Sequence, residues 1–462
     1  MSNSAAVITV VLMQTLAGLG ALTAIGLART YSDLARNLAL APLAGMAWAG
    51  VVAATLASFG SRLSAVGLAA LTLATCAAGA VAVRRRSSAP DVLEQTRAAQ
   101  SWVERAVAAG ALLSLAAVIV AAAALFRVKP LAEYDGWAMW GMKSRAIAAL
   151  GAADPDVFAS AAYSRLHLEY PLLLPSLHAL PLQLEDGFSS NTVVLSCFAI
   201  GVAGLAAVWG LLRDRVRASI LLPFVAALAT APAFFGQLAT GYADVPVATF
   251  VAAGVVASGR WLLDDARAWL ALMTLLVAAA TLTKNEGLLF GVATYAALLI
   301  AAEGRRRAVG LSALLVALVY APWRAFVAIN DLGAPDYDLS SSFNLPWIVG
   351  RLDRIPAAAD GLLSRALDAQ QFTLILLLGV AAVAAVLICG PRRLGVLASG
   401  FSAFSFAGLT WIYVLTPNEV ESFLSTNGDR VIVSLVVGLV ALAPLLFEEA
   451  ARQLAAYDSA RR

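Results

Sequence analysis

The residues best placed to do chemistry are two acids, Glu133 and Asp135, which stand one residue apart just after a long apolar stretch. In an extended backbone, side chains at i and i+2 point the same way, so we expect both carboxylates on one side. Such a pair can hold a cation, or one carboxylate can take a proton while the other orients a hydroxyl. A solvated loop carrying two acids is the plainer interpretation.

The elements that must position these acids are membrane helices. Apolar residues make up 61% of the chain and charged residues 13%, and the mean hydropathy is +0.82, well outside the range of soluble domains. Runs of roughly 20 apolar residues recur, and in lipid they must be helical. We predict an all-α polytopic membrane helical bundle of about 13 transmembrane helices. The predicted spans are 5–27, 38–59, 63–83, 106–126, 191–212, 219–236, 241–258, 268–283, 287–302, 308–329, 371–389, 394–415 and 431–447.

One further apolar stretch, 170–184, is broken by three prolines, which disfavour a regular span. By the positive-inside rule Arg84–Arg86 marks its connection as cytoplasmic, and Arg305–Arg307 falls on the same side if the stretch 170–184 does not cross. We therefore expect it to lie along the outer interface as an external juxtamembrane segment. The N-terminus, interpreted as a retained first helix rather than a signal peptide, is then outside, the C-terminus is inside, and the acidic pair faces the extracytoplasmic side.

This topology divides the chain into four predicted parts. They are N-terminal helices with a cytoplasmic linker (1–104), a core (105–330) with an external acidic loop (127–190), an external loop (331–370), and C-terminal helices with a cytoplasmic tail (371–462). The loop 331–370 either helps to bind the acceptor or is plainly solvated; its notable residues are Asp331, Asp336, Asp338 and Trp347.

Further charged residues stand at the predicted outer helix ends. Lys284 lies in a polar island with Glu286, where the two either pair or leave Lys284 free to face a phosphate. Arg324 and Arg430 either bind the same group or anchor their helices by snorkelling. Asp244 is costly at membrane depth unless it is paired, lies in a water-filled cavity, or caps its helix.

The chain resembles the GT-C superfamily of integral-membrane glycosyltransferases, and most closely the group of protein O-mannosyltransferases and lipid A aminoarabinose transferases. The resemblance rests on motifs in order over roughly 105–330. They are the external acidic pair Glu133-Tyr134-Asp135, the juxtamembrane Tyr170-Pro171-Leu172-Leu173-Leu174-Pro175, Ala243-Asp244-Val245-Pro246, and the turn Thr283-Lys284-Asn285-Glu286-Gly287. The chain departs from that group in having four predicted helices before the acidic loop, a single proline in place of a double one, and no soluble C-terminal domain.

The resemblance implies that a sugar moves from a polyprenyl-phosphate donor to an acceptor hydroxyl on the extracytoplasmic face of a bacterial-type inner membrane, with inversion. The acceptor would be a lipid, a glycan or a protein. Asp135 would be the general base, and Glu133 would orient the acceptor. A divalent cation (Mg, Mn or Ca) shared by Glu133, Asp135 and Asp244 is an open alternative. The donor phosphate would contact Lys284, Arg430, Arg324 and Lys143. Substrate contacts would come from Asp244, His167, Trp137, Tyr163 and Tyr242.

Two other functions fit part of the pattern. A glycan polymerase or ligase with a diphosphate-linked donor also combines many helices with a large external loop. A lipid or sugar transporter would need ionisable groups near the bilayer midplane, whereas here charges gather at helix ends. Nucleic-acid binding lacks a basic face, and the three cysteines lie in apolar runs, where no disulfide framework is indicated.

Overall fold

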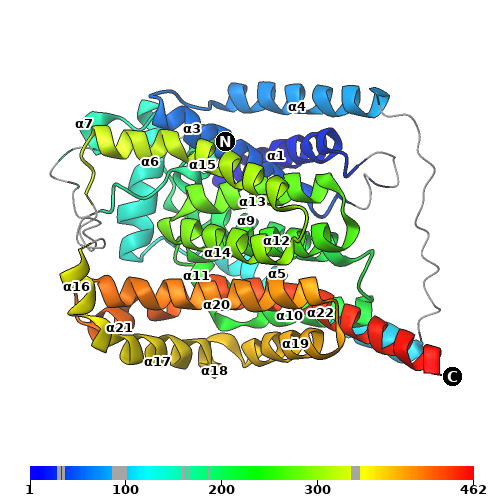
Figure 1. Ribbon diagram of the computed structural model, residues 1–462. Coiled ribbons are helices and arrows are strands. Elements are labelled where there is room, and N and C mark those ends of the chain that lie inside the picture. Colours follow the sequence, from blue (N-terminus) through cyan, green and yellow to red (C-terminus); the bar gives the residue numbers. More distant parts are fainter. Residues whose placement is uncertain are drawn as a thin grey trace.

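A computed structural model describes residues 1–28, 33, 37–85, 101–158, 160, 163, 166–185, 187–333 and 344–461. Within these ranges the chain forms helices and connections, without strands. Most long helices run in one direction of Figure 1, with α21 (Val420–Val431) at one end of the bundle and the C-terminus at the other. Arg86, Asp336 and Asp338, which the topology and loop predictions used, lie outside the described residues.

Each of the predicted spans contains a helix. Nine helices of the described chain are long and apolar enough to cross a membrane, and two bent pairs raise the number to eleven. The nine are α1 (Asn3–Ile25), α3 (Ala41–Ser58), α4 (Ala65–Arg85), α5 (Trp102–Phe126), α9 (Ser190–Leu212), α12 (Asp244–Asp264), α15 (Arg306–Ile329), α20 (Arg392–Leu415), and α21 continued by α22 (Val433–Arg461). The prediction of a polytopic helical membrane protein is confirmed.

The remaining predicted spans are bent or short. One bent pair is α10 (Ala218–Thr230) with α11 (Pro232–Leu238), and the other joins Leu345–Phe372 to α19 (Ile375–Cys389). α13 (Arg267–Thr283) and α14 (Asn285–Ala301) have 17 residues each. At 1.5 Å per residue each is about 25 Å long, slightly less than the hydrocarbon thickness. Leu345–Phe372 contains α16 (Leu345–Val349), a 3-10 turn (Leu352–Arg354), α17 (Ile355–Ala366) and α18 (Ala369–Phe372).

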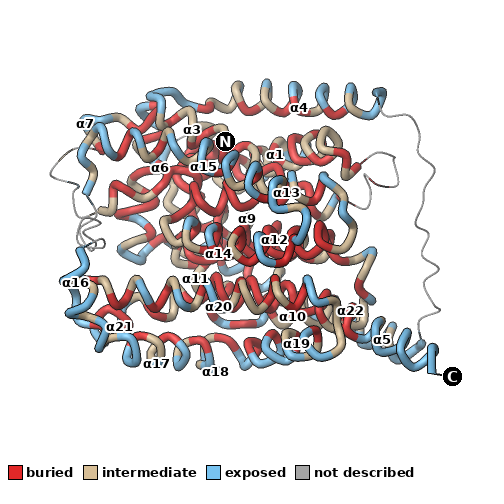
Figure 2. Tube along the Cα trace, in the orientation of Figure 1, coloured by how far each residue is buried: buried red, intermediate tan, exposed pale blue. Residues whose placement is uncertain are grey.

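The centre of the bundle is α12, which is buried along its whole apolar length, whereas α4 and α5 are mostly exposed (Figure 2). α12 packs against α9, α13 and α22. Small residues allow such close packing elsewhere too: a Cβ on Gly45 of α3 would lie 1.6 Å from the Gln14 carbonyl oxygen of α1. α12 is thus the most enclosed of the candidate membrane spans of the described chain.

The proline-broken stretch differs from its prediction. Residues Leu173–Leu182 form α8, whose ten residues are all buried, and α8 packs against α6 (Met142–Leu150) and α3. A helix of that length covers about 15 Å and is too short to cross a bilayer. The stretch is therefore a short helix enclosed by the bundle rather than a segment exposed along an interface, because all ten of its residues, Ser176 and His178 included, are buried.

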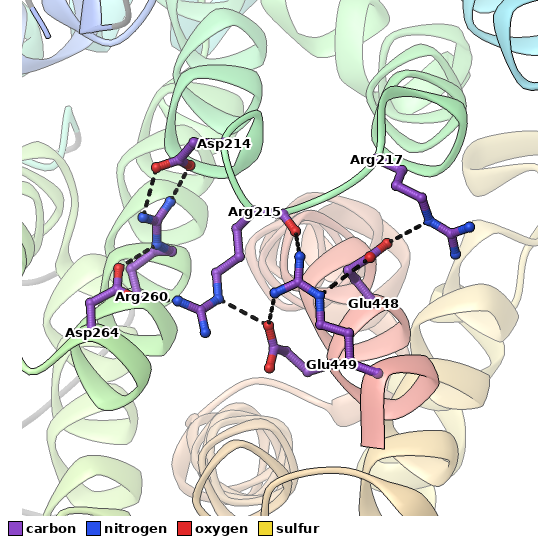
Figure 3. Close-up of polar contacts among 8 residues, drawn as sticks. Asp214, Arg215, Arg217, Arg260, Asp264, Glu448 and Glu449 are labelled. Atoms are coloured by element: carbon purple, nitrogen blue, oxygen red, sulfur yellow. Dashed lines mark hydrogen bonds and ion pairs between the residues drawn. The ribbon is translucent and has the colours of Figure 1, made fainter. Parts of the chain in front are cut away.

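Charged residues gather at both ends of α12. At its C-terminal end, arginines and acids from the α9–α10 connection, α12 and α22 form ion pairs (Figure 3). Arg260 donates two hydrogen bonds to Asp214, at 2.6 and 3.0 Å, and one to Asp264 at 2.9 Å. Asp244, at the other end of α12, is 20 residues from Asp264, or about 30 Å along the axis. This separation matches the thickness of a bilayer core.

Candidate functional site

Five charged residues at the α21 end of the bundle form one chain of ion pairs, here called the charged cluster: Asp135, Asp244, Lys284, Glu286 and Arg430. Lys284 Nζ lies 2.8 Å from Asp244 Oδ1 and 2.9 Å from Glu286 Oε1. Arg430 donates from Nε to Asp244 Oδ2 at 3.2 Å and from Nη1 to Asp135 Oδ2 at 2.6 Å. Residues as far as 295 positions apart in sequence thus meet at one place.

Asp135 reaches the charged cluster from a π-helix, η1 (Asp135–Gly141). π-helical turns are rare and often occur at functional sites. A Cβ on Gly136 would lie 2.1 Å from the Thr240 carbonyl oxygen, so only glycine permits this contact between η1 and the segment before α12. Gly241 has φ +73° and a Cβ there would lie 2.5 Å from Leu131. Two glycines therefore bring the acidic segment against the start of α12.

The predicted extended backbone at the acidic pair is wrong. Tyr134 has helical angles, φ −53° and ψ −55°, so residues 133 and 135 do not share a side as they would in a strand. Asp135 is partly buried and contacts Arg430, whereas Glu133 is exposed. The charge of Glu133 still acts on the Tyr242 phenol, so this acid lies at the border of the charged cluster.

Asp244 and Lys284 are the buried members of the charged cluster, with side chains 2% and 5% exposed. Asp244 is the first residue of α12 and makes no capping hydrogen bond to backbone; both of its oxygens accept from cations instead. Lys284 is the extended residue between α13 and α14. Gly287 lets these helices meet, because a Cβ there would lie 1.9 Å from the Ala280 carbonyl oxygen.

Arg430 comes from the last turn of α21, and its guanidinium lies over the Tyr242 ring, 4.0 Å from the centroid. The neighbouring Asp429 pairs with Arg365 of α17 at 3.2 Å. Burial raises the pKa of the Tyr242 phenol; the Arg430 charge lowers it, and the charges of Asp135 and Glu133 raise it further. Tyr242 therefore stays a neutral hydrogen-bonding group beside the cation.

The charged cluster contains three carboxylates and two cations, so its formal charge is 2 − 3 = −1. Both cations nevertheless keep N–H donors that no carboxylate uses. An ammonium has three N–H donors, and two of those of Lys284 face carboxylates. A guanidinium has five, and the contacts of Arg430 with acids use Nε and Nη1. The charged cluster can therefore hold a further oxygen-rich group by these remaining donors.

A divalent cation does not fit these residues as they are arranged. Both Asp244 oxygens already accept hydrogen bonds from cations, and Glu133 lies exposed at the border. Among the described residues no three His, Cys, Asp or Glu side chains gather as metal ligands. The metal set of Glu133, Asp135 and Asp244 stays a prediction, and no step below is routed through a metal.

Lys143 and His167 form a separate group, away from the charged cluster. Lys143 is fully buried, its Nζ donates to the His167 carbonyl oxygen, and it lies over the Trp140 and Tyr170 rings at 5.5 and 5.6 Å. Burial lowers the pKa of Lys143 to about 7, while the Glu169 charge acts in the opposite direction. Lys143, predicted to contact the donor phosphate, is instead enclosed by aromatic rings.

The other predicted site residues lie outside the charged cluster as well. Arg324 on α15 hydrogen-bonds Tyr320, one turn earlier on the same helix. Trp137 is 53% exposed and meets Tyr134 edge-on at 5.7 Å, and Tyr163 is 38% exposed. The sequence reasoning did not select Glu169, whose carboxylate lies 3.0 Å from His167 Nδ1. Its position directly before Tyr170-Pro171 in the juxtamembrane motif was the available signal.

The fold and the charged cluster define a polytopic helical membrane protein with an ion-paired acid and base site at one end of its helices. Residues 169–326, about a third of the chain, match the family model described as dolichyl-phosphate-mannose-protein mannosyltransferase. The match supports the resemblance to membrane glycosyltransferases of the GT-C type. It contains Asp244 and Lys284, whereas Asp135 and Arg430 lie outside it. No curated protein and no solved structure matches the chain.

Proposed function

We propose that the protein transfers a sugar from a polyprenyl-phosphate donor to an acceptor hydroxyl, with inversion, on the extracytoplasmic face of a bacterial-type inner membrane. The observation that carries the proposal is the convergence of Asp135, Asp244, Lys284 and Arg430 from separate segments at one end of the bundle. An acid with one uncommitted oxygen and two cations with spare donors supply the groups that such a transfer needs.

Asp135 is the proposed general base. Its Oδ2 contacts Arg430, which orients the carboxylate, and its side chain is 24% exposed, so an incoming hydroxyl can reach this side chain. The acceptor oxygen forms a bond to the anomeric carbon from the side opposite the phosphate. The anomeric carbon–oxygen bond breaks, its electron pair goes to the phosphate oxygen, and the hydroxyl proton goes to Asp135. Base catalysis of this kind contributes roughly 10²–10⁴-fold.

Lys284 and Arg430 are the proposed phosphate-binding groups. Both are fixed by Asp244, which is itself almost fully buried. Their remaining N–H donors would hold the departing phosphate without reorganising as its negative charge increases, which is the condition for efficient electrostatic stabilisation. The pairing with carboxylates keeps these cations in place when no phosphate is bound.

The test is release of free polyprenyl phosphate from labelled polyprenyl-phosphate sugars incubated with cell-envelope extract. Replacing Lys284 alone would leave the buried Asp244 carboxylate without one of its two cationic partners, which is a costly change. The informative variant is Lys284→Met with Asp244→Asn, which removes both charges of the most buried pair; Arg430 keeps Asp135 as a partner, and the Glu286 side chain is 15% exposed. This double variant should lose release, whereas Lys129→Met, a lysine at the same end of the bundle, should keep it.

Two results would count against the proposal. Transfer from a diphosphate-linked donor supplied in a parallel assay, with none from polyprenyl-phosphate sugars, would move the protein to the polymerase or ligase class. Wild-type rates in the double variant, with its fold retained, would remove the charged cluster from the reaction.

A further inference from the structure

Three polar atoms beside the charged cluster have no hydrogen-bond partner within the described chain. They are the hydroxyl of Tyr413 on α20, Oε2 of Glu286 and Oε1 of Gln237 on α11. The other ends of two of these groups are committed: Glu286 Oε1 lies 2.9 Å from Lys284, and Gln237 Nε2 donates to the Asp429 carbonyl oxygen at 3.3 Å. Buried polar groups are nearly always paired, so these three atoms require an explanation.

The packing of α14 against α20 places Tyr413 level with the charged cluster. Gly408 of α20 lies against Leu289 of α14, and Gly400 lies against Ala297. The two helices are therefore antiparallel, and continuing the same register puts residue 413 opposite residue 284. The charges of Glu286, Asp244 and Arg430 act on the Tyr413 hydroxyl, as expected from this position.

Tyr413 is held rigidly although its hydroxyl makes no bond. The residue is 1% exposed, and its ring packs against Phe423 of α21 at 5.2 Å between centroids. α21 also carries Arg430, so the phenol and the guanidinium are positioned by the same helix. Leaving a hydroxyl unpaired in such surroundings is unfavourable. Binding of a ligand that supplies the missing hydrogen-bond partner is therefore favoured.

The three atoms match hydroxyl groups rather than a phosphate. Two are oxygens that only accept hydrogen bonds and would repel phosphate oxygens, and the third is a phenol that can donate or accept. The Glu286 charge is already balanced by Lys284, which leaves Oε2 to accept from a neutral O–H. The hydroxyls of a pyranose can each donate and accept, and the sugar lies next to the phosphate that carries it.

We infer that Tyr413, Glu286 and Gln237 bind ring hydroxyls of the donor's sugar and select among neutral hexoses by the configuration of those hydroxyls. This subsite rests on the proposed function, because it lies beside the cations assigned to the donor phosphate. Sites built to hydrogen-bond a substrate hydroxyl discriminate strongly, since a wrongly placed hydroxyl leaves their buried groups unpaired.

The experiment compares initial rates with polyprenyl-phosphate-linked mannose, glucose and galactose, which differ in configuration at C2 or C4. The wild type should prefer one of them. In Tyr413→Phe the rate with the preferred donor should fall about 10- to 100-fold and the other rates much less, so the preference collapses. Glu286→Gln, which keeps the shape, should also weaken the preference.

Two readouts separate this role from a structural one. Tyr413→Phe removes no hydrogen bond from the free protein, so its thermal stability in detergent should be unchanged or higher. The matched control is Tyr295→Phe on α14, a buried tyrosine whose hydroxyl lies 2.7 Å from Ser312; its donor preference should equal that of the wild type.

The failures are distinguishable. Wild-type turnover with an unchanged preference in Tyr413→Phe would overturn the subsite alone. A preference equally reduced in Tyr295→Phe would also overturn it, because general loosening of the bundle would then be the cause. Absence of turnover by the wild type with every polyprenyl-phosphate hexose would overturn the proposed function itself.

Discussion

Replacing Asp135 by Asn should separate two effects of one carboxylate. As the proposed base, Asp135 is needed for the chemical step, and its loss should lower kcat by roughly 10²–10⁴-fold. As an anion bonded to Arg430 at 2.6 Å, it also opposes the negative phosphate of the donor. Its removal brings the formal charge of the charged cluster from −1 to 0 and frees one guanidinium N–H.

The second effect can be estimated from distance. A unit charge about 8 Å from the phosphate at an effective dielectric constant near 20 is worth about 2 kcal/mol. Screening at a side chain that is 24% exposed reduces this to about 1 kcal/mol, or roughly five-fold in affinity. Donor KM should therefore fall while kcat falls, a combination that simple misfolding does not produce.

The assay is initial-rate release of polyprenyl phosphate over a range of donor concentrations, with retention of fold checked by size-exclusion chromatography and thermal unfolding. Asp156→Asn is the matched control, since Asp156 is an exposed acid of the same predicted loop, 127–190; both of its constants should equal those of the wild type. The reasoning would be refuted by a folded Asp135→Asn protein with wild-type kcat, or by one whose donor KM rises.

Three further outcomes are expected. Gly136→Ala should destabilise the protein by about 1–3 kcal/mol and abolish transfer, because a Cβ 2.1 Å from the Thr240 carbonyl oxygen displaces η1; thermal unfolding and the release assay check this. Transfer should persist in chelator-treated protein, since both Asp244 oxygens are engaged by cations; loss of activity restored by one divalent metal would contradict this. Burial lowers the pKa of Lys143 from 10.5 to about 7, so between those values the unfolded chain binds more protons and stability should rise with pH. In Lys143→Met, the increase in the free energy of unfolding from pH 7 to pH 9, measured by denaturant titration, should be smaller than in the wild type. An unchanged increase would argue against a lowered pKa of Lys143.

The membrane helices could be predicted from sequence because apolar length alone specifies them in lipid. The prediction located even α13 and α14, two helices of 17 residues each that meet at the polar island around Lys284. The buried state of α8 was missed, because proline and apolar residues fit an interfacial segment and a buried short helix equally well. Only packing against α3 and α6 distinguishes the two.

Part of the charged cluster could be found because acids and cations at helix ends stand out in an apolar chain. Which of them meet could not be predicted: Arg430 is 186 residues from Asp244 and 295 from Asp135, and no local pattern encodes such pairing. Tyr413 gave no signal, since a tyrosine in an apolar run is ordinary. The enclosure of Lys143 by aromatic rings gave no signal either, because aromatic neighbours are also typical of residues at a membrane interface.

The most direct test of the central claim uses purified wild-type protein in sealed proteoliposomes with a polyprenyl-phosphate donor labelled in both sugar and phosphate, and envelope extract on the outer side. The account predicts that sugar appears in an acceptor product and free polyprenyl phosphate appears in equal amount. Movement of intact donor across the bilayer without product, or transfer only when a diphosphate-linked donor replaces this one, would contradict it.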